Sequence, residues 1–312
     1  MKIKNYAIIA LAATMLVACA NKEEQLHERA MELCQYIPDH ELKEQSQDFM
    51  TQDFYNVLDT MFNHLPEHEA MDHEWLHYFV TGNGGTIADY EVMGVEQTDA
   101  THAIATINVR QKWEDGSFDE TSDVEEHHLY MEKVDGKWLM SDFDEHKQDC
   151  IRHIEINHRE QALRDAMSDY LVKEVGEHYL KGDMCIPSLM VVASEKTNPT
   201  ETRVWCDCWV WWYELSGDTL KTVSGGNHSG CMTIEAKDGK PVVTAFEQTT
   251  DGASFTPSAK RIFGKHYDML QLMHANHDVA EAVRKEQLRE YVQRHNIPVH
   301  YYQDYGWDAV EL

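Results

Sequence analysis

Residues 129–143, LYMEKVDGKWLMSDF, contain the pattern that decides the fold class. Two apolar segments, 129–134 and 138–143, flank Asp135-Gly136, a dipeptide that favours an abrupt reversal between antiparallel strands. Upstream, apolar and polar side chains alternate, which predicts a strand with one buried face. The alternating apolar residues are Ala103, Ala105, Ile107 and Val109. This part of the chain is therefore predicted to form an antiparallel meander.

Helical periodicity precedes this meander. From about Asn21 to His64, apolar side chains recur at spacings of three and four, which predicts a helical segment with one apolar stripe. The stripe contains Phe54, Val57, Leu58, Met61 and Leu65. A second helical run covers 67–80, and the glycine-rich stretch 81–85 ends it.

The same order recurs in the second half of the chain. A helical stripe is followed by predicted strands near 186–195, 202–214, 219–224, 230–237 and 241–249. The stripe consists of Leu163, Met167, Tyr170, Leu171, Val175 and Tyr179. The hairpin Asp238-Gly239-Lys240 repeats Asp135-Gly136-Lys137, which favours a diverged tandem duplication. We interpret the glycines of 225–230 as a hairpin turn, and two helical runs, 257–275 and 277–295, close the chain.

These patterns predict an α+β protein with two tandem domains, each made of helices and a curved antiparallel sheet, and a helical C-terminal extension. The acidic, irregular stretch 144–159 is the predicted domain boundary. The predicted divisions are a signal peptide at 1–18, a tether and first helix at 19–38, a first domain at 39–148, and a second domain with the C-terminal helices at 149–312.

The order of elements resembles the nuclear transport factor two-like and cystatin-like superfamily, in which helices pack into the concave side of a curved antiparallel sheet. The resemblance covers about 40–145 and 160–250 and leaves the two C-terminal helices outside it. It implies a dimerisation module, a small-ligand pocket or an acid–base enzyme, because this fold hosts all three.

The first residues indicate export. Lys2 and Lys4 precede an apolar run at 7–17 that ends in Leu16-Val17-Ala18-Cys19, and this arrangement resembles the signal of bacterial lipoproteins. Cys19 would then carry lipid. An ordinary signal peptide or an uncut anchor is the alternative, but an uncut span needs about twenty apolar residues.

The residues after Cys19 bear on location. Residues 20–24 lack the aspartate that commonly retains lipoproteins in the inner membrane, so we expect the outer membrane. The run Lys22-Glu23-Glu24 resembles a tether signal for the cell surface, although the charged start of a solvated helix explains it equally well.

The formal net charge of −28 disfavours polyanionic partners, so no nucleic acid is expected to bind. Expected partners are the lipid of the outer membrane, through the acyl chain, and a protein or small-molecule ligand. Six cysteines remain after Cys19, and an exported protein can form disulfides. A bridge from Cys206 or Cys208 to Cys231 is predicted.

Two patterns suggest metal sites. His73-Glu74-Trp75-Leu76-His77 spells HExxH, in which two histidines bind zinc beside a glutamate that acts as general base, with Glu96 as a candidate third ligand. On a helix, however, His73 and His77 lie opposite the apolar side, which favours a solvent-exposed position. Residues 115–126 have the oxygen spacing of a calcium loop, but Glu120 occupies the position of the required glycine, so an acidic hairpin loop is favoured.

The segment 204–213 is apolar at both alternating sets of positions, which predicts a strand covered on both faces. Trp205, Trp209, Trp211 and Tyr213 share one face as a predicted ligand-binding surface or interface. The helix near 160–180 would cover the other face. The aromatic face could receive the first domain, the C-terminal helices, or a ligand that stacks on the rings.

Asp207 lies among these tryptophans. Burial would raise its pKa and suit it to proton abstraction, a role that resembles that of the carboxylate in steroid-isomerase-like members of the superfamily. Arg203 could instead pair with it. We expect a non-enzymatic binding or assembly module with no cofactor beyond the lipid at Cys19. The alternative is an enzyme, either a zinc hydrolase using His73, Glu74 and His77 or an acid–base enzyme using Asp207.

Overall fold

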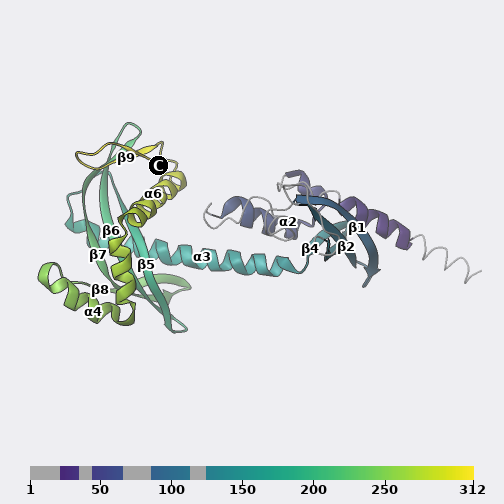
Figure 1. The fold of residues 1–312 in the computed structure, drawn as a ribbon, viewed down its shortest axis with the longest axis horizontal. Helices are drawn as coiled ribbons and strands as arrows, with labels where there is room; N and C mark the ends of the chain where they lie inside the picture. Colours follow the sequence, from purple (N-terminus) through teal and green to yellow (C-terminus); the bar gives the residue numbers. More distant parts are fainter. Residues whose placement is uncertain (1–21, 35–43, 66–85, 113–123) are drawn as a thin grey trace, which may run out of the picture. The chain divides into compact units, whose positions relative to one another are not determined.

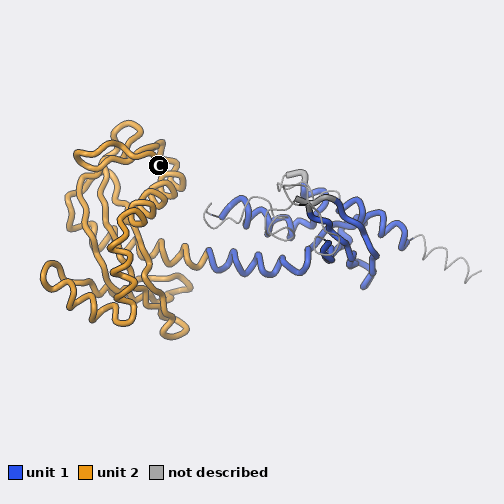
Figure 2. The backbone as a smooth tube through the Cα atoms, in the orientation of Figure 1, with its two compact units in different colours: residues 1–157 blue, residues 158–312 orange. Residues whose placement is uncertain are grey.

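The computed structural model describes residues 22–34, 44–65, 86–112 and 124–312 (Figure 1). The chain divides into two compact units, residues 1–157 and residues 158–312 (Figure 2). Each unit combines helices with a largely antiparallel sheet, which confirms the predicted α+β class.

The division between the units falls inside one helix, α3 (His146–Tyr170). The sequence places the boundary after residue 148, at an irregular stretch. The expectation of irregular structure is wrong, because residues 146–159 are helical. The stretch contains neither proline nor glycine, the two residues that oppose a helix most strongly, so a helix can form even where apolar periodicity is weak.

Unit 1 contains a four-stranded antiparallel meander in the order β1-β2-β3-β4. Its strands are β1 (Thr86–Gln97), β2 (His102–Lys112), β3 (Val124–Val134) and β4 (Lys137–Phe143). The preceding helical segments are residues 22–34, η1 (Glu44–Asp48), α2 (Gln52–Asp59) and η2 (Thr60–His64). The helical stripe and the alternating face of β2 meet in one core, as the sequence predicts. Its buried members include Phe54, Leu58, Met61, Ala103, Ala105, Ile107 and Val109.

Unit 2 contains a six-stranded sheet in the order β10-β9-β7-β6-β5, with β8 paired to the remaining part of β7. The strands are β5 (Met184–Asn198), β6 (Glu201–Ser216), β7 (Thr219–Lys237), β8 (Lys240–Gln248), β9 (Tyr301–Gln303) and β10 (Val310–Glu311). The later helical segments are η4 (Leu171–Val175), η5 (Gly176–His178), η6 (Gly252–Ser254), α4 (Phe255–Phe263), η7 (Gly264–His266), α5 (Tyr267–Ala275) and α6 (His277–Arg294). The two predicted C-terminal helical runs are thus confirmed, whereas β9 and β10 were not predicted.

Both predicted Asp-Gly hairpins are confirmed. Asp135 and Gly136 have φ of 49° and 84°, and Asp238 and Gly239 have φ of 51° and 77°. Positive φ at both central residues is the type I′ geometry that matches the twist of antiparallel strands.

The predicted turn at 225–230 is wrong, because β7 runs through it as one continuous strand. These glycines do not reverse the chain but allow aromatic side chains to pack closely against the strand. A Cβ atom on Gly225 would lie 2.3 Å from the ring of Trp211, and one on Gly226 would lie 2.1 Å from the hydroxyl of Tyr179. Two aromatic side chains therefore lie directly against the backbone of β7.

Strand β6 is covered on both faces, as the sequence predicts. On one face, Cys206, Cys208 and Val210 pack in one core with α3 and η4. On the other, Trp205 packs against α4 and donates a hydrogen bond of 2.8 Å to the carbonyl of Ile262. Of the three covers considered for the aromatic face, the structure shows the C-terminal helices.

The predicted disulfide is not formed, because the described cysteines, including Cys206, Cys208 and Cys231, are free. Cys231 lies opposite Trp205 in the β6–β7 pairing and shares its face. Cys206 and Cys208 are on the other face, since side chains alternate along a strand.

Six buried free thiols lead to a testable expectation. Burial raises the pKa of Cys34 and of Cys150 to about 12 and that of Cys185 to about 11, so these thiols stay protonated and unreactive at neutral pH. We expect a thiol reagent to leave the native protein unmodified and to modify six cysteines besides Cys19 after denaturation without reductant. A count of four would contradict the structure and restore a disulfide.

Candidate functional site

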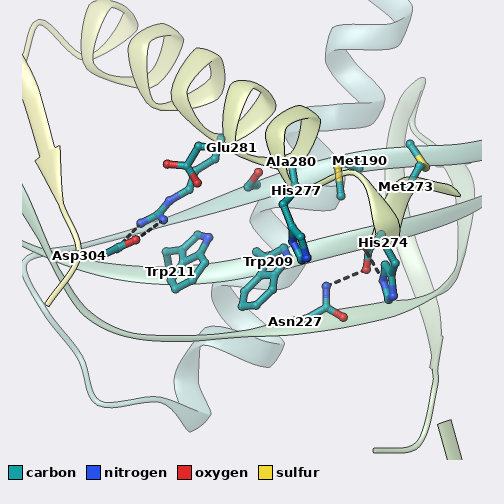
Figure 3. A pocket seen from close by; sticks show the side chains of 13 residues that line it. Met190, Trp209, Trp211, Asn227, Met273, His274, His277, Ala280, Glu281 and Asp304 are labelled. Carbon is teal, nitrogen blue, oxygen red and sulfur yellow. Dashed lines mark hydrogen bonds and ion pairs between the residues drawn. The ribbon is translucent and has the colours of Figure 1, made fainter. Parts of the chain in front are cut away.

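Unit 2 contains a pocket of 480 Å³ between the sheet and helices α5 and α6 (Figure 3). Its volume is in the range of small-molecule sites. It is lined by Ser188, Met190, Asp207, Trp209, Trp211, Asn227, Met273, His274, His277, Ala280, Glu281, Arg284 and Asp304.

The floor of the pocket is a pair of stacked indoles on β6. Trp209 and Trp211 alternate on one face of the strand, and their ring centroids are 4.8 Å apart with an interplanar angle of 2°. Trp209 is flanked across the sheet by Ser188 and Asn227. Because Gly225 has no side chain, Trp211 lies against β7 and the floor remains flat.

The roof is the first half of α6. His277, Glu281 and Arg284 recur at spacings of four and three, so they share the helix face that lines the pocket. One turn further, the amide of Gln287 accepts a hydrogen bond of 2.7 Å from the main-chain nitrogen of Leu189 and donates one of 2.9 Å to its carbonyl. This side chain hydrogen-bonds to the main chain of β5 and fixes the distance between α6 and the sheet.

Arg284 closes one end of the pocket. Its guanidinium donates two hydrogen bonds of 2.8 Å to Asp304, one of 3.0 Å to the hydroxyl of Tyr213, and one of 3.0 Å to that of Thr222. It also lies 4.2 Å from the ring centroid of Trp211. The bonds from Arg284 hold the pKa of Asp304 below its ordinary value. The positive charge of Arg284 is therefore paired with the carboxylate of Asp304 within the protein.

Asp207 closes the other end. Its carboxylate accepts hydrogen bonds of 2.6 Å from Ser229 and 2.7 Å from Asn227, and forms an ion pair of 2.9 Å with His274. Burial alone would raise the pKa of Asp207, but the bonds from His274, Ser229 and Asn227 outweigh it and lower the pKa.

Two expectations for Asp207 are therefore wrong. Its pKa is lowered, so it is a poor candidate for the proton-abstracting base of the enzyme alternative. Its ionic partner is His274, whereas Arg203 lies over the ring of Trp205 at 4.9 Å from the centroid.

Several groups that line the pocket have no polar partner among the described residues. The indole nitrogen of Trp211 is one of them, but it is buried, so its N–H is not open to the pocket. One oxygen of Glu281 accepts the hydroxyl of Tyr302, while no partner of the other is found in the described part of the chain. Trp209 is half-buried, and His277 extends from α6 into the space above the sheet (Figure 3).

The structure thus separates the predicted aromatic residues. Trp209 and Trp211 line the pocket, whereas Trp205 is buried under α4 and Tyr213 is buried beside α6.

The other predicted site residues are not brought together. Glu96 is exposed on β1, and His73, Glu74, His77, Cys19 and most of 115–126 lie outside the described residues. Among the described residues, no group of three or more histidine, cysteine, aspartate or glutamate side chains could hold a metal ion.

Sequence reasoning found Asp207 at one end of the pocket but missed its partner His274, the roof residues His277 and Glu281, and the Arg284–Asp304 pair at the other end. One signal was available. Arg284, Leu288 and Val292 are spaced by four and are all buried, so a charged residue continues an apolar stripe. A buried arginine requires a partner, and that partner, Asp304, is distant in the sequence.

Comparison with known proteins adds little. No family model and no curated protein matches the chain. A solved structure of an "Ntf2 like protein involved in plasmid conjugation" is 10% identical, with a TM-score of 0.18, and the match covers 66% of this chain and 86% of that one. That TM-score does not show a shared fold, so the α+β class is shown by the chain's own helices and sheets.

The Asp207–His274 ion pair makes stability depend on pH. Bonding to Asp207 raises the pKa of His274, so this contribution is complete below about pH 6.5 and is lost as the pH rises through the folded pKa. The pKa of Asp207 is lowered, so its contribution is present above about pH 4 and is lost at lower pH.

We therefore expect the loss of unfolding free energy in His274→Gln to be larger at about pH 5.5 than at about pH 9. Denaturant unfolding at both pH values measures it. The matched control is His277→Gln, because His277 is exposed and has no ion pair among the described residues. A loss in His274→Gln that does not change with pH would contradict the ion pair.

Proposed function

We propose that this protein is a lipid-anchored binding protein of the outer membrane, and that its second unit binds a small ligand in the pocket between β6 and α6. The observation that carries the proposal is the pocket of 480 Å³ itself, in which the indole of Trp209 is half-buried and one oxygen of Glu281 has no partner among the described residues.

The composition of the pocket supports ligand binding over simple packing. Aromatic and apolar side chains share the wall with polar groups, several of which are fixed by hydrogen bonds within the protein, and small-molecule sites combine the same two kinds of group. The buried charges at both ends are paired within the protein, which keeps the walls rigid before a ligand arrives.

The anchoring part of the proposal is supported by the sequence, since Cys19 follows a lipoprotein-like signal. Within the described residues, no helix has the length and apolar character needed to cross a membrane. We further propose that the units are diverged copies of a nuclear transport factor two-like domain. In support, each has helical segments before a four-strand meander that ends in an Asp-Gly hairpin.

Filling the pocket tests ligand binding. Ala280 lines it from α6, so Ala280→Phe should occupy the ligand volume. The matched control, Ala282→Phe, introduces the same side chain at an exposed position of the same helix. In a thermal-shift screen of chemically diverse small molecules, we expect compounds that stabilise the wild-type protein to lose their effect in Ala280→Phe and retain it in Ala282→Phe. If no compound distinguishes the two variants, the pocket is not a binding site.

Removing the acylated thiol tests the anchor. In Cys19→Ser, we expect the protein to leave the membrane fraction, because the signal can no longer be processed to a lipidated terminus. Mass spectrometry of the N-terminal peptide and cell fractionation measure the change. An unmodified, uncleaved terminus in the wild-type protein would refute the anchor without affecting the pocket.

A further inference from the structure

We infer that the pocket selects a small organic cation, such as a primary or quaternary ammonium compound. This inference rests on the proposed ligand-binding function and adds the chemical class of the ligand. It depends on the balance of charge in the pocket, on the aromatic floor, and on which groups remain uncommitted.

The charge of the lining is negative. Asp207, Glu281 and Asp304 contribute three carboxylates, and Arg284 is the permanently charged cation among the described lining residues. Even with His274 protonated, the carboxylates remain in excess. The chain as a whole carries a formal net charge of −28, so its field also attracts cations and repels anions.

Arg284 and His274 are both paired with carboxylates, so neither is free to bind an anionic ligand, whereas the lining residue His277 has no ion pair among the described residues. Arg284 directs four of its N–H groups at Asp304, Tyr213 and Thr222. His274 is bound to Asp207 at 2.9 Å. Binding an anion at Arg284 or His274 would require breaking one of these pairs and leaving its carboxylate without a counter-charge.

A cationic ligand would find two suitable partners. The half-buried indole of Trp209 provides a π-face, and tryptophan is the aromatic side chain that attracts cations most strongly. Glu281 adds a carboxylate oxygen on the opposite wall without a partner among the described residues. Figure 3 shows the two on facing elements, with Trp209 on the sheet and Glu281 on the helix above it.

The probe should carry a cationic group whose charge can be removed without changing its shape. Choline is a suitable probe because uncharged and anionic compounds of nearly the same shape exist.

The experiment compares two matched series with the full mature protein by isothermal titration calorimetry. The first series is choline, 3,3-dimethylbutan-1-ol and 3,3-dimethylbutanoate. The second is benzylammonium, benzyl alcohol and benzoate. We expect the cation of at least one series to bind about tenfold more tightly than its neutral analogue, to bind more weakly at high ionic strength, and the anions not to bind.

Variants locate the effect. Glu281→Gln keeps an acceptor for Tyr302 and removes the charge, so it should reduce the preference for the cation over the neutral analogue. Glu286→Gln removes the same charge from α6 at a position that does not line the pocket, and it should leave the preference unchanged.

The outcomes separate this inference from the proposed function. Equal or tighter binding of neutral or anionic analogues, or no cation with a dissociation constant below about 10 mM, overturns the cation preference. If neutral compounds bind and Ala280→Phe abolishes their binding, the pocket is still a ligand site and only the cation inference fails. If no compound binds in this experiment or in the thermal-shift screen, both fail.

Discussion

The burial of strand β6 on both faces is the constraint on which unit 2 depends. A four-stranded meander covered by one helix would leave the aromatic face of β6 exposed to water. An exposed apolar patch of this kind favours association or aggregation. The C-terminal helices satisfy that need within the chain. Trp205 is covered by α4, and Tyr213 is covered by α6. The two C-terminal helical runs, which lie outside the resemblance to the nuclear transport factor two-like and cystatin-like superfamily, are therefore part of the core of unit 2.

The same cover is incomplete over the middle of the strand. Between Trp205 and Tyr213, the roof is built from polar residues of α6 in place of the leucine and valine of its later turns. The Arg284–Asp304 pair and the Gln287 amide attach the helix to the residue after β9 and to β5 at fixed distances. Apolar side chains at those positions would close the gap, because interiors pack to high density. The polar network thus keeps a pocket open where collapse would otherwise be favoured.

Sequence patterns predicted the features that depend on local geometry. The Asp-Gly dipeptides specify their hairpins, the alternation around Ile107 specifies a buried face, and the doubly apolar segment 204–213 specifies a doubly covered strand. The errors concern features that depend on distant partners. The glycines at 225 and 226 are typical of a turn in the sequence. In the structure they make room for the rings of Trp211 and Tyr179. The pKa of Asp207 is lowered, whereas burial alone would raise it. The hydrogen bonds that lower it come from His274 and Ser229, which are distant from Asp207 in the sequence and could not be predicted from it.

The candidate site was therefore only half visible in the sequence. Its floor is on one strand, where a period of two reveals which rings share a face. Its roof comes from α6, and its ends need His274 on α5 and Asp304 after β9, whose placement depends on tertiary contacts. The excess of carboxylates over paired cations becomes visible only when the floor and the roof are considered together. His274 is paired with Asp207 and Arg284 with Asp304, so Glu281 and the half-buried indole of Trp209 remain available to a ligand. A site arranged in this way discriminates by charge more than by shape, since the surplus carboxylate is specific and the aromatic floor is tolerant.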